Sequence, residues 1–209
     1  GQETVKETYS EEELKALLEK PQGDSYCEWR CWAIINWILA TGNREKTVCN
    51  VRMRDINLPD EEIVLQQTKN KKIQIIPMST ELSFVLTQFI RDFRSEADDD
   101  EFLFCNVSGE QLTENALKLS IRDYNAARGV KKTSVHALRH TFAKLWIHNN
   151  GDVFRLQKML GHSTLDMTRN YVNLFAVDLK EGFDEYSPLD RMVRKRRKKH
   201  TIKRNKPTA

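Results

Sequence analysis

The sequence has no hydrophobic run long enough to cross a membrane. Its main apolar stretch, residues 32–40, is much shorter than the roughly 20 apolar residues that a membrane-spanning helix needs. No signal peptide is recognisable before Thr8, and no internal repeat marks a solenoid or an array. We therefore expect a cytoplasmic protein without a membrane partner.

Cysteine is also scarce, and its spacing indicates neither a metal site nor a disulfide framework. The four cysteines are Cys27, Cys31, Cys49 and Cys105. No two of them form a C-x-x-C pair, and no histidine lies near them at the spacing of zinc ligands. Cys27 and Cys31 are four residues apart on a predicted helix, so we expect both to be small apolar core residues. This usage favours a reducing, intracellular compartment.

The sequence does contain enough apolar residues for one domain, and its charge is unevenly distributed. Of the 209 residues, 39% are hydrophobic, which is sufficient for one core. The net charge is +4, yet ten of the 34 basic residues and none of the 30 acidic ones follow residue 190. The first 190 residues are therefore slightly acidic. The basic tail suits a polyphosphate such as nucleic acid, an anionic membrane surface or simply a solvated end.

Hydrophobic periodicity and capping signals predict a mainly α chain with one small antiparallel β-sheet, an α+β fold. Two β-rich pieces, 62–68 and 72–77, indicate a hairpin, and 54–58 would add an edge strand. The predicted helices are 10–20, 24–41, 44–50, 80–94, 113–127, 134–150, 152–161 and one that begins after Ser163. We expect one domain over residues 1–190 and a flexible basic tail over residues 191–209.

The residues with the strongest chemical meaning lie between His136 and Tyr171. His136 and Arg139 are three apart on one predicted helix, so both project from one face. His136 also lies in the first helical turn, where free backbone N–H groups favour a phosphate. Gly161 ends the next helix and leaves His162 on a loop. Taken alone, His-x-x-Arg is a frequent accident on a helix surface. Taken together, two imidazoles, a guanidinium and a phenol suit attack on a phosphodiester.

The order and spacing of these residues resemble the signature of the tyrosine recombinases, the phage integrase family. Arg139 of the His136-x-x-Arg139 pair stands 23 residues before His162. That histidine belongs to Leu160-Gly161-His162, and Tyr171 follows it nine residues later.

The upstream half of the chain carries the rest of the family pattern. The segment Thr41-Gly42-Asn43-Arg44 resembles the family's Thr-Gly-x-Arg segment. Residues 68–77 resemble its hairpin with a mobile lysine, for which Lys69 is the first candidate and Lys71 an equally reachable one. The resemblance spans residues 10–190 and implies the fold of the tyrosine recombinase catalytic domain.

The resemblance implies cleavage of one DNA strand by Tyr171, which leaves a 3′-phosphotyrosyl link and a free 5′-hydroxyl. Because the pKa of a phenol lies at about 10, the tyrosine needs activation, and His136 is the predicted proton acceptor or relay. Arg44 and Arg139 would hold the non-bridging phosphate oxygens and stabilise the charge of the pentacoordinate state. His162 would add a hydrogen bond to the same phosphate.

The implied reaction requires no metal and no other cofactor. Two permanent cations take the place of Mg²⁺, and the sequence offers no convincing carboxylate cluster for a metal ion. Lys69 would protonate the leaving 5′-oxygen as general acid. The covalent link conserves the phosphodiester energy, so strand exchange needs no ATP, and the sequence has no P-loop that would bind it.

One position departs from the family pattern. The family usually carries an acidic residue three positions after its first arginine, and here that position is Thr47. The carboxylate that would brace Arg44 is therefore missing, and Glu45 is the candidate substitute. His140, on the same helix as His136, is predicted to lie in the layer behind the site.

Further positive charges are predicted to contact DNA phosphates. They are the hairpin and tail residues Lys71, Lys72, Arg194, Arg196, Arg197 and Lys198. In the family, a segment at the position of residues 175–186 often docks on a neighbouring protomer; a helix packed on its own chain is the alternative. We expect double-stranded DNA at specific recombination sites as the partner, bound by a homotetramer, and a monomer in the absence of DNA.

The leading interpretation is a site-specific recombinase or integrase, encoded by a bacterium or a phage, that inserts or excises a mobile element such as a conjugative transposon. The alternatives are a type IB topoisomerase, which uses the same phosphotyrosine chemistry, and a non-catalytic DNA-binding regulator. The intact catalytic set argues against the regulator, and the compact integrase-type motifs argue against the topoisomerase. Family recombinases usually carry an N-terminal DNA-binding domain, which we expect to lie outside this chain.

Overall fold

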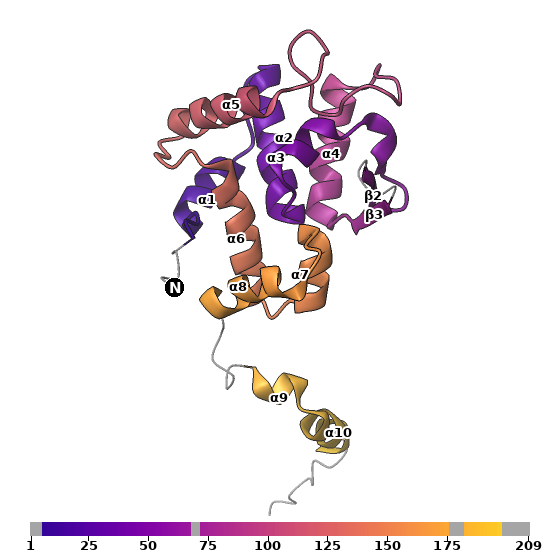
Figure 1. Cartoon of the computed structure of the whole chain (residues 1–209), viewed down its shortest axis with the longest axis vertical. Helices are drawn as coiled ribbons and strands as arrows, with labels where there is room; N and C mark the ends of the chain where they lie inside the picture. Colours follow the sequence, from indigo (N-terminus) through magenta and orange to yellow (C-terminus); the bar gives the residue numbers. More distant parts are fainter. Residues whose placement is uncertain (1–5, 68–71, 176–181, 198–209) are drawn as a thin grey trace, which may run out of the picture. The chain divides into compact units, whose positions relative to one another are not determined.

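The computed structural model describes residues 6–67, 72–175 and 182–197, without the side chains of residues 67, 72 and 194–197. It divides into two units, residues 1–175 and residues 176–209, which are described separately below. The described part is mainly helical and contains one small antiparallel sheet, which confirms the predicted fold class (Figure 1).

The first unit is built around α2 (Tyr26–Thr41), which is buried on nearly all sides. Because α2 is apolar over most of its circumference, only a central position removes it from water. Its neighbours, visible around it in Figure 1, are α1 (Glu11–Leu18), α4 (Thr80–Phe93), α5 (Glu114–Ala127) and α6 (Val135–His148). Trp29, Trp32 and Trp37 of α2 all lie in this core.

Gly42 ends α2 and turns the chain back against α6. Its φ of 67° lies in the left-handed region, and its N–H donates to the carbonyl of Ile38 at 2.8 Å. A Cβ at this position would stand only 2.4 Å from Cδ1 of Phe142, so the close approach requires glycine. The next helix, α3 (Glu45–Asn50), therefore begins beside α6, with Arg44 as its N-cap residue.

The sheet has three antiparallel strands in the order β1-β2-β3. They are β1 (Ile56–Asn57), β2 (Glu62–Gln67) and β3 (Lys72–Pro77), preceded by the short 3-10 helix η1 (Met53–Asp55). The register pairs Ile63 with Ile76 and Gln67 with Lys72, so the predicted hairpin is confirmed. The predicted edge strand is confirmed as well, although it has only two residues. The hairpin tip, residues 68–71, lies outside the described residues.

Two further helices complete the first unit, α7 (Val153–Leu160) and α8 (Leu165–Phe175). Both pack against α6 and against each other, below α6 in Figure 1. Asp152 accepts a hydrogen bond from the Arg155 N–H at the start of α7, and Gly161, with a φ of 64°, ends that helix. These short helices are positioned so that the loop between them faces the N-terminal half of α6, where Arg139 contacts Leu160 and His162.

The second unit contains α9 (Phe183–Tyr186) and α10 (Pro188–Arg197). The predicted flexible tail begins inside α10, because the helix continues through Arg197. Pro188 stands in the first turn, where its missing N–H is not needed, and the Ser187 hydroxyl accepts a hydrogen bond from the Asp190 N–H. The predicted boundary at residue 190, between catalytic domain and tail, stays a prediction.

The described cysteines are all free thiols. Cys31, Cys49 and Cys105 are buried as small core residues, whereas Cys27 is exposed, so its predicted place in the core is wrong. It points away from the packed side of α2, and the spacing of the cysteines alone does not identify which side that is.

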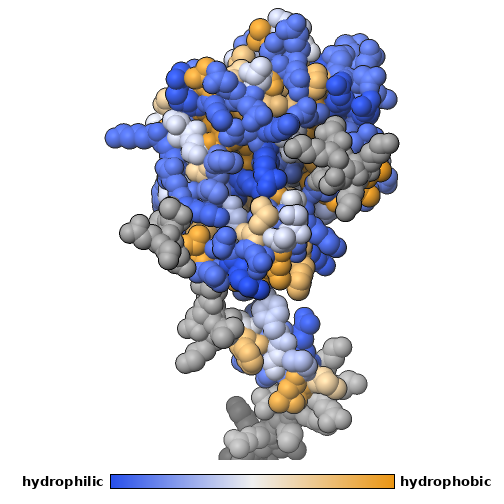
Figure 2. All heavy atoms as spheres, viewed as in Figure 1, coloured by the Kyte–Doolittle hydropathy of each residue, from blue (hydrophilic) through white to orange (hydrophobic). Residues whose placement is uncertain are grey.

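Within the described residues, no helix combines the length and the apolar character that spanning a membrane requires. The face of the molecule in Figure 2 is mainly hydrophilic, with hydrophobic residues in small groups.

Candidate active site

Arg139 of α6 is the most buried charged residue of the candidate site, with 5% of its surface exposed. Its Nη1 donates to the carbonyl of Gly42, and its Nη2 donates to the carbonyl of Leu160 at 2.9 Å. The guanidinium thus joins the ends of α2 and α7 to the middle of α6. Burial lowers the pKa of Arg139 to about 10, with a further contribution from the nearby Arg44. The group is still cationic at pH 7.

His162 lies on the loop between α7 and α8, as predicted, and its tautomer follows from its two partners. Its Nε2 is 3.2 Å from Nη2 of Arg139, and its Nδ1 is 2.9 Å from Oγ1 of Thr168. A guanidinium can only donate, so Nε2 accepts and the ring proton resides on Nδ1. Burial, together with the positive charge of Arg139, lowers the pKa of His162 to about 4. His162 is therefore neutral at pH 7.

Tyr171 of α8 is 4% exposed, and its hydroxyl oxygen is 2.8 Å from Nδ1 of His140. Burial raises the pKa of this phenol, although the charges of Arg139 and Arg44 act in the opposite direction. Burial also lowers the pKa of His140 to about 4. At pH 7 the phenol is protonated and the imidazole is neutral, and in the tautomer with the ring proton on Nε2 the hydroxyl donates to Nδ1.

The structure changes the predicted partner of the phenol. His136, predicted as its proton acceptor or relay, is exposed and makes no hydrogen bond with Tyr171 among the described contacts. Instead its ring stacks on that of His140, with centroids 5.9 Å apart and an angle of 26° between the planes. The two histidines are four residues apart, on one face of α6. Since α8 packs beside the deeper one, His140 contacts the tyrosine directly.

Arg44 is exposed, and its side chain forms no hydrogen bond or ion pair with any residue that the structure describes. Glu45, its predicted brace, is 8% exposed and pairs with Nζ of Lys118 on α5 at 3.1 Å. Glu45 therefore does not replace the missing carboxylate in this structure. Thr47 is partly exposed on the same helix, α3.

The position of Arg44 is determined by its backbone instead. Trp37 donates from Nε1 to Oδ1 of Asn43 at 2.9 Å, and the Asn43 N–H donates to the hydroxyl of Thr41 at 3.2 Å. Asn43 and Thr41 are both buried. The chain is thus fixed up to the residue before Arg44, and the guanidinium that follows is left free to bind a ligand.

The predicted lysine of the hairpin cannot be placed, because Lys69 and Lys71 lie outside the described residues. The same applies to Lys198 and to the side chains of Lys72, Arg194, Arg196 and Arg197. The hairpin itself reaches the site, since Nε2 of Gln74 donates to the carbonyl of Lys158 at 2.7 Å. Lys158 lies in the last turn of α7, two residues before Leu160, whose carbonyl accepts from Arg139.

Two residues of the site were not predicted. Thr168 is fully buried, and its hydroxyl contacts His162. It stands three residues before Tyr171, on the same helix face, and this spacing could have indicated from the sequence that it belongs to the site. Lys6 lies with Nζ 3.6 Å from the centroid of the Tyr171 ring, and no local pattern connects residues so distant in sequence.

In the described part of the chain, no three His, Cys, Asp or Glu side chains gather in a way that could hold a metal ion.

Comparison with known proteins identifies the family. The phage integrase family matches residues 7–177. Tyrosine recombinase XerD of Chlamydia trachomatis is 29% identical over 189 residues, 87% of this chain and 62% of that protein. Tyrosine recombinase XerA of Pyrococcus furiosus is 28% identical over 193 residues, 91% of this chain and 65% of that protein. The chain thus spans somewhat less than two thirds of the length of these relatives.

Solved structures show the same fold. The crystal structure of XerA recombinase superposes with a TM-score of 0.69 at 28% identity, and covers 87% of this chain and 64% of its own. The catalytic domain of bacteriophage HP1 integrase, with a TM-score of 0.57 and 23% identity, covers 88% of this chain and 96% of its own. With the fold, the spacing of the site residues and the family match over residues 7–177 in agreement, the chain belongs to the phage integrase family.

Proposed function

We propose that this chain is the catalytic part of a site-specific DNA recombinase that cleaves and rejoins strands through a covalent 3′-phosphotyrosyl intermediate at Tyr171. The observation that carries the proposal is the convergence of a phenol, two imidazoles and a buried guanidinium at the junction of α6, α7 and α8. The names of the relatives, tyrosine recombinases XerD and XerA, support the same reaction.

Activation of the nucleophile begins with His140. Because Nδ1 lies 2.8 Å from the phenol oxygen of Tyr171, the tautomer of His140 with its proton on Nε2 is in place to accept the phenol proton as the oxygen attacks the phosphorus. His136, stacked on His140 and exposed, then acts as the relay: it takes up the proton from His140 through a bridging water molecule and releases it to solvent. The role proposed for His136 is thus indirect.

The scissile phosphate is bound by Arg44 and Arg139. Arg139 uses three of its five N–H donors on Gly42, Leu160 and His162 and also interacts with the phenol of Tyr171, so its guanidinium is in place to donate to a non-bridging oxygen beside that phenol. Arg44 has all of its donors available among the described contacts and supplies the second cation. Both stabilise the charge that develops in the pentacoordinate state, the largest expected contribution to the rate.

His162 contacts the phosphate only after a change of protonation. Its Nε2 accepts from Arg139 in this structure and has no proton to give. A phosphate dianion-like transition state beside it raises the pKa of an imidazole. We propose that His162 becomes a donor at that stage, and that Lys69, on the hairpin whose base contacts α7, protonates the leaving 5′-oxygen.

The partner proposed for this site is double-stranded DNA at specific recombination sites, in the cytoplasm, bound by a homotetramer. The reaction proposed is integration or excision of a mobile element. Lys71 and Lys72 of the hairpin and the basic residues of the tail would contact further phosphates of the bound DNA.

A nicked suicide DNA substrate tests the nucleophile. The intact chain should form a covalent protein–DNA adduct that is visible as a shifted band on a denaturing gel. Tyr171→Phe should abolish this band, because it removes the attacking oxygen. Tyr186→Phe is the matched control, since Tyr186 lies exposed in the second unit, and it should keep the adduct. An adduct that persists in Tyr171→Phe would overturn the assignment.

The salt dependence of DNA binding tests the tail. If about six of the ten basic residues after residue 190 contact phosphates, deletion of residues 191–209 should reduce the log–log salt slope by roughly five. Fluorescence anisotropy with labelled duplex DNA at several salt concentrations measures this slope. A deletion that leaves the slope unchanged contradicts the DNA-binding role of Arg194, Arg196, Arg197 and Lys198.

A further inference from the structure

The ammonium of Lys6 lies over the ring of the proposed nucleophile, from a segment far away in sequence. Its Nζ is 3.6 Å from the centroid of the Tyr171 ring, well within the roughly 6 Å over which a cation is attracted to an aromatic face. The ring is also approached by His140 and His162, with centroid distances of 5.6 and 6.1 Å. Lys6 contributes the one ammonium among these described neighbours.

We propose that Lys6 is a positioning residue for Tyr171, which holds the phenol ring beneath its ammonium and favours the phenolate over the phenol. The proposal rests on the proposed function of Tyr171 as nucleophile. It assigns a role in the reaction to a residue that lies outside the recombinase sequence motifs.

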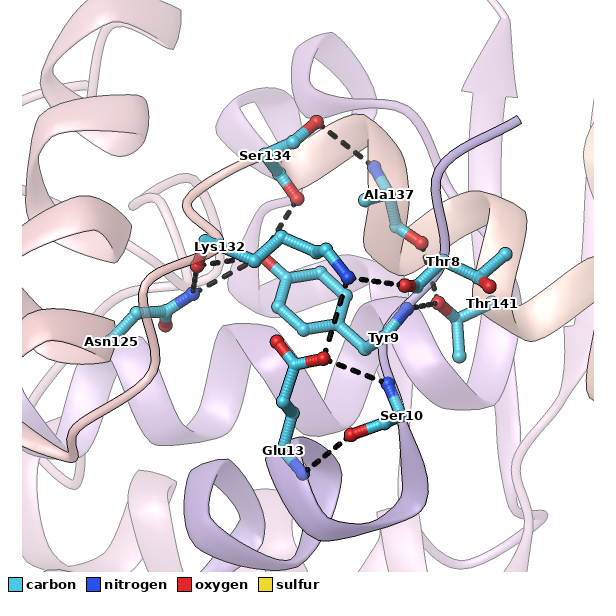
Figure 3. A network of polar contacts seen from close by, with 9 residues as sticks. All are labelled: Thr8, Tyr9, Ser10, Glu13, Asn125, Lys132, Ser134, Ala137 and Thr141. Carbon is cyan, nitrogen blue, oxygen red and sulfur yellow. Dashed lines mark hydrogen bonds and ion pairs between the residues drawn. The ribbon is translucent and has the colours of Figure 1, made fainter. Parts of the chain in front are cut away.

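Lys6 is held in place by an N-terminal strap, residues 6–10, whose anchor is Tyr9 (Figure 3). Tyr9 is 4% exposed, and its N–H donates to the hydroxyl of Thr141 on α6 at 2.9 Å. Its own hydroxyl donates to the Ser134 carbonyl at 3.0 Å and accepts from Nδ2 of Asn125 at 3.1 Å. The strap is thus fixed to the helix that carries Arg139 and His140.

A second set of contacts fixes the strap beside its anchor. Nζ of Lys132 donates to the carbonyl of Thr8 at 2.6 Å and pairs with Glu13 of α1 at 3.3 Å. Glu13 and Ser10 form a reciprocal capping box at the start of α1 (Figure 3). These hydrogen bonds fix the backbone of Thr8, Tyr9 and Ser10. Lys6 is therefore separated from this fixed backbone by one residue, Glu7.

The groups that share this site with Lys6 are other cations and imidazoles. The groups that contact or act on the phenol are Arg139 and His140 from α6, His162 from the α7–α8 loop and Arg44 before α3, and His136 stacks on His140. Lys6 forms no ion pair with a carboxylate in the described part of the chain. Its pKa is lowered by burial first and by Arg139 second.

An ammonium among other positive groups is unfavourable until a negative charge forms nearby. The phenolate of Tyr171 is such a charge, because it develops next to the ring that Lys6 covers. The same ammonium also lowers the pKa of His140 and of His162, after the larger effects on each. Lys6 thereby favours the neutral form of both imidazoles, and its favourable effect on the reaction is the one on the phenolate.

The phenol can be titrated directly in the DNA-free protein. 3-Fluorotyrosine, whose phenol is more acidic than that of tyrosine, is incorporated at position 171 and its pKa is followed by ¹⁹F NMR. Lys6→Met should raise this pKa by roughly one unit, as expected for a unit charge lost at this separation. Lys6→Arg, which retains a cation over the ring, should stay within about 0.3 unit of the starting protein. Lys20→Met is the control, because Lys20 lies exposed over Trp29 instead.

Cleavage of the suicide substrate supplies the second readout. Lys6→Met should slow adduct formation at pH 7 by about threefold to tenfold, since one pKa unit corresponds to a tenfold change in phenolate. Its pH–rate profile should shift to higher pH, and Lys6→Arg should restore both.

The outcomes separate this inference from the proposed function. A Lys6→Met variant with an unchanged phenol pKa and an unchanged pH–rate profile overturns the role of Lys6, while cleavage by the starting protein still supports the nucleophile. If the starting protein forms no adduct, the proposed function fails, and the NMR titration still decides whether Lys6 acts on Tyr171.

Discussion

The two halves of the candidate site differ in how far they are assembled without DNA. In the half on α6, α7 and α8, every functional side chain has a partner: Arg139 holds two carbonyls and His162, and His140 holds Tyr171. In the half that follows α2, Arg44 is exposed and unpaired among the described residues. The guanidinium of Arg139 thus both joins parts of the fold and belongs to the candidate site, whereas the guanidinium of Arg44 belongs to the candidate site alone.

This difference has a physical reason. A buried guanidinium must satisfy its N–H groups within the protein, because an unpaired buried donor costs free energy. Arg139 does so on the carbonyls at two helix ends, which are themselves short of donors. Arg44 stays in water, so it costs nothing to leave unpaired, and a phosphate can replace its hydration shell. The first half can orient the proposed nucleophile, Tyr171, and the second can adapt to the proposed DNA substrate.

The largest expected effect comes from removing each arginine in turn. Arg139→Ala should lower the rate of adduct formation by about a thousandfold and the free energy of unfolding by about 3 kcal/mol, because two carbonyls lose their buried donors. Arg44→Ala should lower the rate by about a hundredfold or more with a stability change below about 0.5 kcal/mol. Urea unfolding and suicide-substrate cleavage measure the two quantities separately.

Arg30 provides the matched control for burial. It is 4% exposed on α2 and donates to the carbonyl of Cys105 at 2.8 Å, away from the site. Arg30→Ala should therefore destabilise the protein while the folded fraction cleaves normally. An Arg44→Ala variant that is destabilised as strongly as Arg139→Ala would show that the two halves of the site do not differ.

The histidines of the assembled half should make stability depend on pH. The pKa values of His140 and His162 are lowered to about 4 by burial, against about 6.5 in an unfolded chain. The unfolded state therefore binds more protons between these values, and the fold loses stability as the pH falls from about 6.5 towards 4. Above pH 7 the contribution is fully present.

Denaturant unfolding at a series of pH values tests this. His140→Gln should flatten the loss of stability between about pH 6.5 and pH 4. His148→Gln is the control, because His148 is exposed near the end of the same helix, and it should leave the pH dependence as it was. Equal curves for the two variants would contradict the assignment of the pH dependence to His140.

Local signals predicted the fold and the motif residues, and packing decided the rest. Gly42 and Gly161 end helices as expected, because a left-handed residue after a helix is a short-range feature. The choice between His136 and His140 is different. Both lie on one face of α6, and only the position of α8 determines which of them meets Tyr171.

Charged partners were the least predictable part. Glu45 is adjacent to Arg44 in sequence, yet it pairs with Lys118 on α5, because α3 turns its acidic side towards that helix. Lys6 meets Tyr171 only because the strap crosses α6, a contact between residues at opposite ends of the first unit. Such pairings depend on the tertiary arrangement and leave no pattern within a sequence window.

The smallest expected effect concerns Thr168, which sharpens the comparison within the assembled half. Its hydroxyl accepts from Nδ1 of His162 and so keeps Nε2 free of a proton. Thr168→Val, which preserves the shape, should cost about 1 kcal/mol of unfolding free energy for the lost hydrogen bond. It should slow adduct formation by a few fold, because the ring is no longer held in one tautomer. Thr87→Val, at an exposed position within α4, should change neither. ¹⁵N NMR of the His162 ring nitrogens measures the tautomer directly; a ring that keeps its proton on Nδ1 in Thr168→Val would mean that Arg139 alone determines it.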